Sequence, residues 1–289
     1  STLTVNEVKT QLARLQLAIN SVMVDRLKTA GELGLQFNGQ RDIYQAAGYD
    51  KVITPAMYHT RYARQSLAWP VVEAAPNETW RIPPQILDGP KPEESRDDTD
   101  FVNAWRQLAT GGKLQSDGDT TLGLLHYLHR LDCQAGLGQY GVLLLGTRDE
   151  GYDLSQPLKA NSLKSPDDLI YFSVYPQLHA SILTMETDNS NRRYGLPATY
   201  QLTTTTGGAV GGATVNLQQV AHWTRILHVA ESLQSDDIFG TPRLEGVWNE
   251  LLNLEKIMAA SGEAAWKLSD AGTLFSTKDG AKLPTKPDE

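Results

Sequence analysis

Two histidines, an aspartate and the only cysteine of the chain follow one another closely. His126, His129 and Asp132 are spaced three residues apart, and Cys133 lies next to Asp132. Imidazole, carboxylate and thiolate groups bind Zn²⁺, and residues three apart on a helix are neighbours. Successive steps of three nevertheless turn around the helix, and no second cluster in the sequence supplies a fourth ligand. We therefore expect partly buried, hydrogen-bonded histidines here, with no metal ion.

Two further histidines occur in the pattern His-x-Ser/Thr, at 179–181 and 222–224, and His59 is followed directly by Thr60. Two His-x-Ser/Thr strands are able to place two imidazoles as general acid and general base around a phosphodiester. This pattern is found in two-histidine phosphoesterases. Only the last two histidines fit it, so His59 is outside this hypothesis.

The glycines at 136, 138 and 141 spell G-x-G-x-x-G. A dinucleotide site needs a strand before the first glycine and a helix after the last, so that the helix N-terminus faces the pyrophosphate. Here the order is reversed, because a predicted helix precedes the motif and an apolar strand follows it. We expect the glycines to end a helix in a turn, without a cofactor. The sequence also lacks the G-x-x-x-x-G-K-(S/T) loop of a packaging ATPase.

The composition is acidic, with 26 basic and 34 acidic residues and a formal net charge of −8 over 289 residues. Proteins that hold DNA by neutralising phosphates usually carry a basic excess or a basic stripe. A single cysteine excludes an intrachain disulfide and fits a reducing compartment. The apolar runs fall short of the roughly 20 residues that span a bilayer, so no membrane contact is expected.

The first half of the chain is predicted to be mainly helical. An N-terminal helix should end near Gly31, and a proline-rich acidic stretch at 82–98 indicates an exposed linker. Helices should follow at 99–109 and 119–134. Apolar residues at alternating steps of three and four place one seam along the N-terminal helix, and this seam needs a partner. Its members are Val5, Val8, Leu12, Leu15, Ile19 and Val22.

The character of the sequence changes to β in its second half. A buried strand is predicted at 140–145, and β-branched and aromatic residues predominate from 169 to 229. The expected strands lie at 171–175, 199–205, 214–217 and 223–229. The sequence therefore predicts an α+β protein.

The most informative block starts at His222-Trp223-Thr224-Arg225, which alternates like a half-buried strand. Gly240, Thr241 and Pro242 then form a candidate hinge and helix cap, with Thr241 as N-cap and Pro242 at the first helical position. A strand, a hinge and a long helix in this order resemble portal proteins of tailed bacteriophages, in the branch where His-Trp-(Ser/Thr)-Arg precedes Gly-x-Pro-Arg-Leu-Glu. Further matching strings lie at 33–35, 49–51, 61–64, 78–81, 138–146 and 193–200.

The resemblance implies a subunit with a mixed α/β wing, a β-rich segment and a long stem-like helix. It assigns residues 1–168 to the wing and 231–289 to the stem helix with a polar tail. Residues 169–230 are left open between wing and clip. Portal chains continue beyond the stem helix, whereas this sequence ends in the polar tail, so counterparts of the tunnel loop and crown are not expected in it.

The predicted stem helix, from Pro242 to about Trp266, has two faces at helical spacing. Its candidate subunit-packing residues are Leu244, Val247, Trp248, Leu251, Leu254 and Met258. Its candidate solvent- or lumen-facing residues are Glu245, Asn249, Lys256 and Glu263. We expect the first face to pack against protein and the second to face water.

The resemblance implies a structural ring subunit without catalysis or cofactors, which forms the DNA conduit at the capsid vertex for genome packaging, genome ejection and head-to-tail joining. It implies assembly in the host cytoplasm, and partners that include further copies in a dodecamer, the terminase, the major capsid or scaffold protein, a tail adaptor and passing duplex DNA. Two alternatives stay open: a two-histidine phosphoesterase acting against host cyclic-nucleotide defence, and a non-portal virion adaptor. Because His222 lies in the portal-like string, a structural strand is favoured there.

Overall fold

The computed structural model describes residues 5–32, 42–89, 96–110, 123–149, 153–206, 215–234 and 236–269. The chain divides into two compact units, residues 1–248 and residues 249–289. The first unit combines helices with two antiparallel sheets, which confirms the predicted α+β class. The described part of the second unit consists of the remainder of one long helix.

The helices of the first unit follow the sequence prediction in part. The bounds are α1 (Val5–Glu32), α2 (Ile43–Ala47), α3 (Pro55–Arg64), α4 (Ala68–Thr79), α5 (Asp100–Thr110) and α6 (Leu124–Leu137). Helices α1 and α5 lie where the sequence predicted them. Helix α6 begins at Leu124, with Gly123 at its N-cap, whereas the predicted start at position 119 lies outside the described residues. Pro55 occupies the first turn of α3, where its missing N–H is not needed.

Two three-stranded antiparallel sheets form the rest of the first unit. The first sheet has the order β2-β1-β6, and the second has the order β3-β4-β5. The strands are β1 (Gly141–Thr147), β2 (Leu169–Pro176), β3 (Ala180–Met185), β4 (Pro197–Thr206), β5 (Val215–His222) and β6 (Ile226–Val229). Strand β1 pairs with both β2 and β6, so this sheet joins residues from both sides of position 168.

The predicted strand at 223–229 is wrong in its first half. His222 ends β5, the residues Trp223–Arg225 form a 3₁₀ turn, and β6 begins at Ile226 in the other sheet. The His222 imidazole accepts a hydrogen bond from the backbone N–H of Thr224 and so caps this turn. The apolar–polar alternation continued through the turn and concealed the change of sheet.

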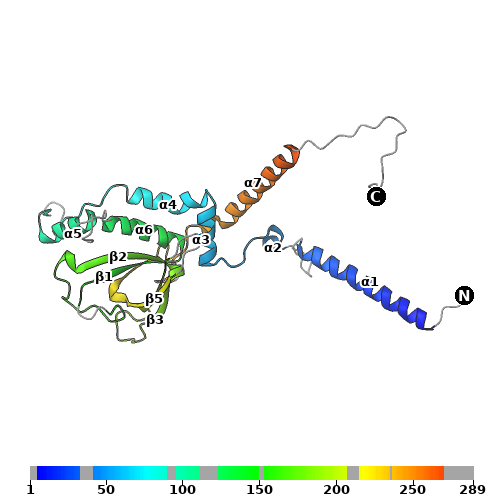
Figure 1. Cartoon of the computed structure of the whole chain (residues 1–289), viewed down its shortest axis with the longest axis horizontal. Coiled ribbons are helices and arrows are strands. Elements are labelled where there is room, and N and C mark those ends of the chain that lie inside the picture. Colours follow the sequence, from blue (N-terminus) through cyan, green and yellow to red (C-terminus); the bar gives the residue numbers. More distant parts are fainter. Residues whose placement is uncertain are drawn as a thin grey trace. The chain divides into compact units, whose positions relative to one another are not determined.

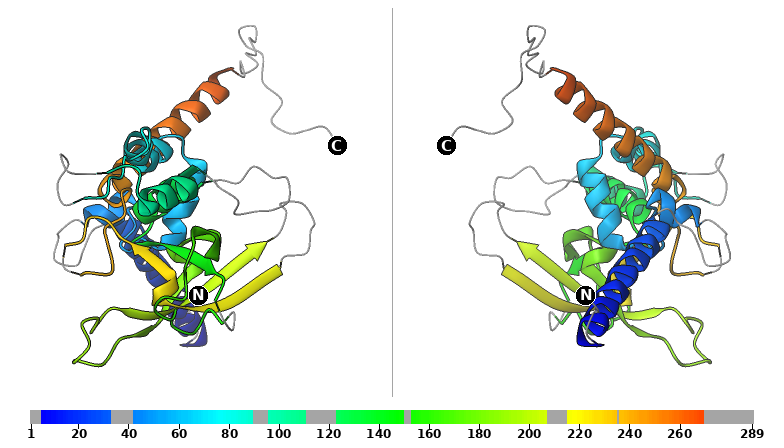
Figure 2. Two further views of the ribbon diagram at one scale, coloured as in Figure 1. Left: turned by 90° about the vertical axis from the view of Figure 1, so that its left-hand side faces the viewer. Right: turned by 90° about the vertical axis from the view of Figure 1, so that its right-hand side faces the viewer.

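Strand β1 is buried on both faces, which explains its continuous apolar run. Val142 and Leu144 belong to a buried cluster with Tyr200 and Leu202 of the second sheet. Leu143 points the other way, because side chains alternate along a strand, and packs in a cluster with Leu131 of α6. Helix α6 thus covers one face of the first sheet, and α4 packs against α6 (Figures 1 and 2).

Arg225 is buried, and the carboxylate of Asp149 balances its positive charge. Its side chain is 2% exposed and forms an ion pair with Asp149, donating from Nη1 to Oδ1 at 2.9 Å. It also donates to the backbone oxygen of Gln156 at 3.1 Å and to the Thr147 hydroxyl. These hydrogen bonds to Asp149 lower the pKa of its carboxyl group to about 2. The arginine of the portal-like string therefore joins the start of β6 to the end of β1.

The lead-in segment as candidate functional site

The residues between β6 and the long helix α7 (Trp248–Ser269) form what we call the lead-in segment, residues 230–234 and 236–247. This segment is held by backbone hydrogen bonds to the end of α6 and the turn that follows. The N–H of Gly240 donates to the carbonyl oxygen of Gln139 at 2.7 Å, and the N–H of Arg243 donates to that of Gly136 at 2.8 Å. The candidate hinge is therefore bonded to the body of the first unit.

The predicted helix start at Pro242 is wrong, because α7 begins at Trp248 after a single 3₁₀ turn at 245–247. The N–H groups of Thr241 and Arg243 already donate to carbonyl oxygens of Glu231 and Gly136. Backbone groups bonded in this way hold the chain in a non-helical path. The Thr241 hydroxyl donates to the carbonyl oxygen of Ser232 at 3.3 Å, so it does not cap α7.

Gly240 is required by a close approach of two backbone segments. A Cβ atom at this position would lie 2.0 Å from the carbonyl oxygen of Glu231. We expect Gly240→Ala to destabilise the protein by about 1–3 kcal/mol, the usual cost of overpacking. Gly246→Ala is the matched control, since no atom lies within 4 Å of its added Cβ, and its effect should stay within about 0.5 kcal/mol. Urea unfolding of the three proteins measures both values, and equal losses would contradict the assignment.

Arg243 is the centre of this site. Its guanidinium forms ion pairs with Asp132 of α6 at 2.8 Å and with Glu231 at 2.6 Å. It also donates to the backbone oxygen of Val72 in α4. Burial raises the pKa of Glu231, and Arg243 opposes that rise. One side chain therefore connects the lead-in segment to α4 and α6.

Gly136 provides the space that Arg243 occupies. A Cβ on this residue would lie 2.5 Å from the Arg243 side chain. The predicted order of elements around the glycine motif is confirmed, because Gly136 lies inside α6, Gly138 is the C-cap and β1 follows from Gly141. The absence of a side chain at Gly136 thus allows the Arg243 side chain to pack against α6.

Trp248, the first residue of α7, is enclosed by polar and aromatic groups. Its indole is 3% exposed and its Nε1 donates to Asp50 at 2.9 Å. The Arg61 guanidinium lies 3.6 Å from the indole ring centroid and also donates to the Trp248 carbonyl oxygen at 2.7 Å. Tyr58 meets the indole edge-to-face at 5.2 Å between centroids. The end of the lead-in segment is therefore anchored by a cation–π contact and two hydrogen bonds.

The predicted packing face is buried at its beginning and exposed further along. Leu244, Trp248 and Leu251 are buried, Val247 and Leu254 are half-buried, and Met258 is 63% exposed. On the predicted polar face, Glu245, Lys256 and Glu263 are exposed and Asn249 is half-buried. The later turns of α7 also expose Ile257, Trp266 and Leu268.

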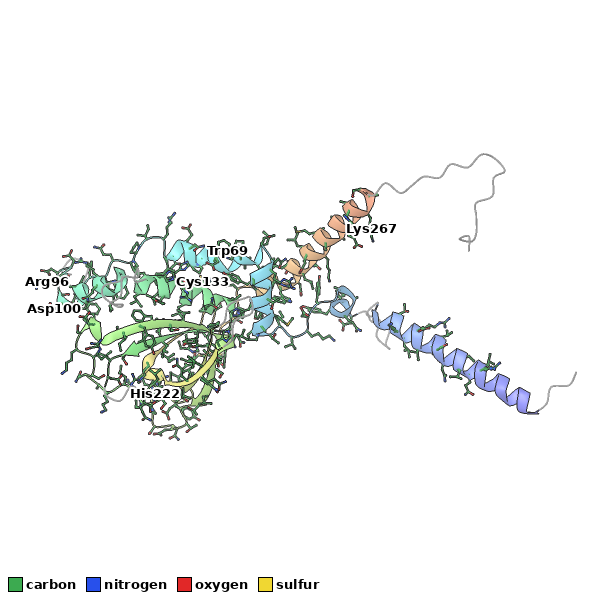
Figure 3. The ribbon with its side chains drawn as sticks, in the orientation of Figure 1. Trp69, Arg96, Asp100, Cys133, His222 and Lys267 are labelled. Atoms are coloured by element: carbon green, nitrogen blue, oxygen red, sulfur yellow. The ribbon has the colours of Figure 1, made fainter. Side chains whose placement is uncertain are left out.

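The histidines of the phosphoesterase hypothesis do not form one site. The His179 imidazole lies near that of His59, whose pKa is lowered by burial and by this neighbour. His222 lies opposite Thr199, which itself lies opposite Thr184 on β3. His222 is therefore level with Thr184, two strands away and several residues along from His179. Figure 3 shows His222 among the strands, apart from Cys133 on α6.

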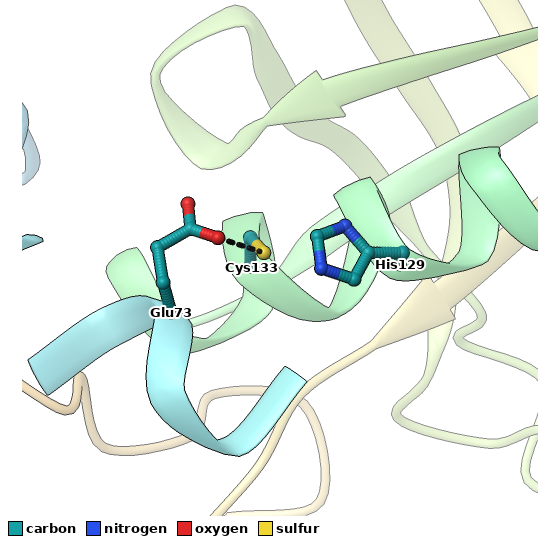
Figure 4. A group of neighbouring side chains, drawn as sticks. All are labelled: Glu73, His129 and Cys133. Atoms are coloured by element: carbon teal, nitrogen blue, oxygen red, sulfur yellow. Dashed lines mark hydrogen bonds between the residues drawn. The ribbon is translucent and has the colours of Figure 1, made fainter. Parts of the chain in front are cut away.

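The histidine–aspartate–cysteine group of α6 is divided in the structure. His126 is exposed and stacks edge-to-face on Tyr127. Both oxygens of Asp132 are bonded, one to Arg243 and one to the indole N–H of Trp80 at 2.9 Å. His129 and Cys133 instead meet Glu73 of α4 (Figure 4).

Residues 56–276 match the phage portal protein family, and the chain belongs to that family. Among curated proteins no sequence matches the chain. Two similar solved structures are the virion of a native gene transfer agent particle, at 16% identity, and the neck of the native particle computed with C12 symmetry, at 15% identity. Both alignments have a TM-score of 0.44, and they cover 78% and 79% of this chain. The chain spans about half the length of those it matches, 47% and 50%.

No helix among the described residues combines the necessary length with sufficient apolar character to cross a bilayer.

Proposed function

We propose that this chain is a structural subunit of a portal ring at the head–tail junction of a phage-like particle. The observation that carries the proposal is the family match over residues 56–276, which spans both sheets, the lead-in segment and α7. In this role the chain catalyses no reaction and works through its contacts with other proteins. Its site is the virion vertex, where the terminase, the capsid or scaffold protein and a tail adaptor are the expected partners.

The regions of the subunit follow from this role. Helix α7 is the stem helix, and the first sheet belongs to the wing. Strands β2 and β6 share that sheet with β1, which supports placing them with the wing rather than a separate clip. Arg243 and Trp248 then fix the point from which the stem helix starts. Duplex DNA passes without sequence-specific binding, as the net charge of −8 favours.

Two helices carry apolar side chains that an isolated subunit leaves exposed. On α1 these are Leu15, Leu17, Ile19, Val22, Met23, Val24 and Leu27. On α7 they are Ile257, Met258, Trp266 and Leu268. A head-to-tail ring uses two different surfaces of each subunit, and the exposed apolar side chains on these two helices provide candidate surfaces. Val5, Val8 and Leu12, which begin the predicted seam, lie in the part of α1 whose side chains the structure does not describe.

The direct test is the oligomeric state of the full chain. Negative-stain electron microscopy and mass photometry should show closed rings, with twelve subunits as the expected number for a portal. Particles that remain monomeric or dimeric at micromolar concentration would contradict the proposal.

Met258 offers a variant that separates assembly from folding. We expect Met258→Lys to leave the melting temperature of the subunit unchanged, because the side chain is 63% exposed there. If the ring buries this residue, each interface loses about 1.5–3 kcal/mol, a weakening of about tenfold or more. Glu255→Lys, on the exposed surface of the same helix, is the matched control. A ring yield for Met258→Lys equal to that of the unmodified chain would show that Met258 lies outside the interface.

A further inference from the structure

Two pairs of side chains face each other across helices α4 and α6. Glu73 and Asn77 lie one turn apart on α4, and His129 and Cys133 lie one turn apart on α6. A carboxylate oxygen of Glu73, a ring nitrogen of His129 and the Sγ of Cys133 all lie within 4.8 Å of one another. Figure 4 shows the three side chains directed toward one another from the two helices.

The three side chains of the cluster are hydrogen-bonded to one another or to a neighbouring residue. The Cys133 thiol donates to Oε2 of Glu73 at 3.3 Å, and the Tyr62 hydroxyl donates to Oε1 of the same carboxylate at 2.5 Å. Nε2 of His129 lies 2.9 Å from Oδ1 of Asn77. Cys133 is 5% exposed, whereas His129 is half-buried. The cluster is therefore organised, and it is reached from solvent on the histidine side.

We propose that Glu73, His129 and Cys133 bind a single zinc ion that links α4 to α6. Zinc takes a sulfur, a nitrogen and an oxygen ligand in one tetrahedral site, with bonds of about 2.0–2.3 Å. Such bonds place the ligand atoms about 3.5 Å apart. Atoms at the 4.8 Å limit must therefore approach by about 1.3 Å, whereas Cys133 Sγ and Glu73 Oε2 are already 3.3 Å apart. The thiol proton passes to solvent as the sulfur–metal bond forms. Thiolate and carboxylate then balance the two positive charges of the ion.

The neighbouring side chains limit the number of protein ligands that the ion can have. Asp132 is excluded as a ligand, since its oxygens bond to Arg243 and Trp80. Among the described residues, three protein ligands thus remain, and water completes the fourth position.

The ion would stabilise the two helix segments that bind Arg243. Glu73 follows Val72, whose carbonyl oxygen accepts from Arg243, and Cys133 follows Asp132, which is paired with the same guanidinium. A metal bound to Glu73 and Cys133 therefore holds together the two helix segments that bind Arg243. Metal binding should raise the melting temperature of the first unit.

Titration of the full chain with Co²⁺, a spectroscopic substitute for Zn²⁺, tests the assignment. We expect one ion per chain and a thiolate-to-cobalt charge-transfer band that Zn²⁺ removes by competition. Cys133→Ser should abolish the band, and His129→Gln and Glu73→Gln should weaken binding at least tenfold.

His126→Gln is the matched control, because His126 lies on the same helix, is exposed and is outside the cluster. It should bind Co²⁺ as the unmodified chain does. Circular dichroism melts of each variant without metal establish that the fold is intact, and the half-buried His129 is the position where the fold is least affected. A titration without a thiolate band, or equal weakening by His126→Gln and His129→Gln, would overturn the proposal.

Discussion

Replacement of Trp248 by alanine should lower the free energy of unfolding by about 3–5 kcal/mol, the range for truncating a buried tryptophan. The change removes an indole that is 3% exposed and leaves the Asp50 carboxylate without its N–H donor. It also removes the aromatic face beneath the Arg61 guanidinium and the edge contact with Tyr58. Since these partners come from separate segments of the first unit, the whole unit should lose stability.

Urea unfolding followed by far-UV circular dichroism measures this effect without relying on tryptophan fluorescence. Trp266→Ala is the matched control, because the same substitution is made in the same helix at a side chain that is 75% exposed. Its effect on subunit stability should stay within about 0.5 kcal/mol. Similar losses for the two variants would show that the contacts around Trp248 contribute little.

The sequence predicted best those elements whose signal is local. The apolar steps of α1, the pattern of α5 and the apolar run of β1 each lie within one element, so a short window contains the whole pattern. The order of elements around the glycine motif was predictable for the same reason. It needed only the helix before Gly136 and the strand after Gly141.

The errors occurred where tertiary bonds override a local pattern. Thr241-Pro242 has the composition of a helix start, but the backbone N–H groups of this segment bond to Glu231 and Gly136. The segment from Trp223 to Val229 alternates as one strand would, yet a 3₁₀ turn divides it between two sheets. In both cases the local propensity contributes less free energy than the hydrogen bonds to distant segments.

The functional contacts were less accessible to sequence reasoning than the fold. Arg225 and Arg243 contributed to the family resemblance, but their partners lie 76 and 111 residues away, at Asp149 and Asp132. Nothing in the sequence brings Glu73 together with Cys133, which is 60 residues further along the chain. Only the packing of α4 on α6 brings these groups together. The single usable signal was the spacing of His129 and Cys133, four residues apart, which places both on one helix face.

Arg243→Met should lower the free energy of unfolding by about 3 kcal/mol, near the lower end of the range for removing one partner of a buried ion pair. The lower end applies because the network is partly solvated, with side-chain exposures of 15% for Arg243, 25% for Asp132 and 32% for Glu231. The variant leaves two carboxylates facing each other without their cation. The loss therefore reflects uncompensated charge as well as lost contacts.

A second substitution separates these two contributions. Arg243→Met combined with Glu231→Gln removes one of the unpaired charges, so it should recover part of the stability that Arg243→Met loses. Arg96→Ala serves as the control for a surface ion pair, since Arg96 and Asp98 are 69% and 66% exposed and such pairs contribute about 0–1 kcal/mol. If Arg243→Met were as mild as Arg96→Ala, or if the double variant were as unstable as the sum of its single changes, Arg243 would not be the charge-matched link between the lead-in segment and the helices. A large loss with partial recovery would establish that the Arg243 guanidinium stabilises the lead-in segment by balancing the charges of Asp132 and Glu231.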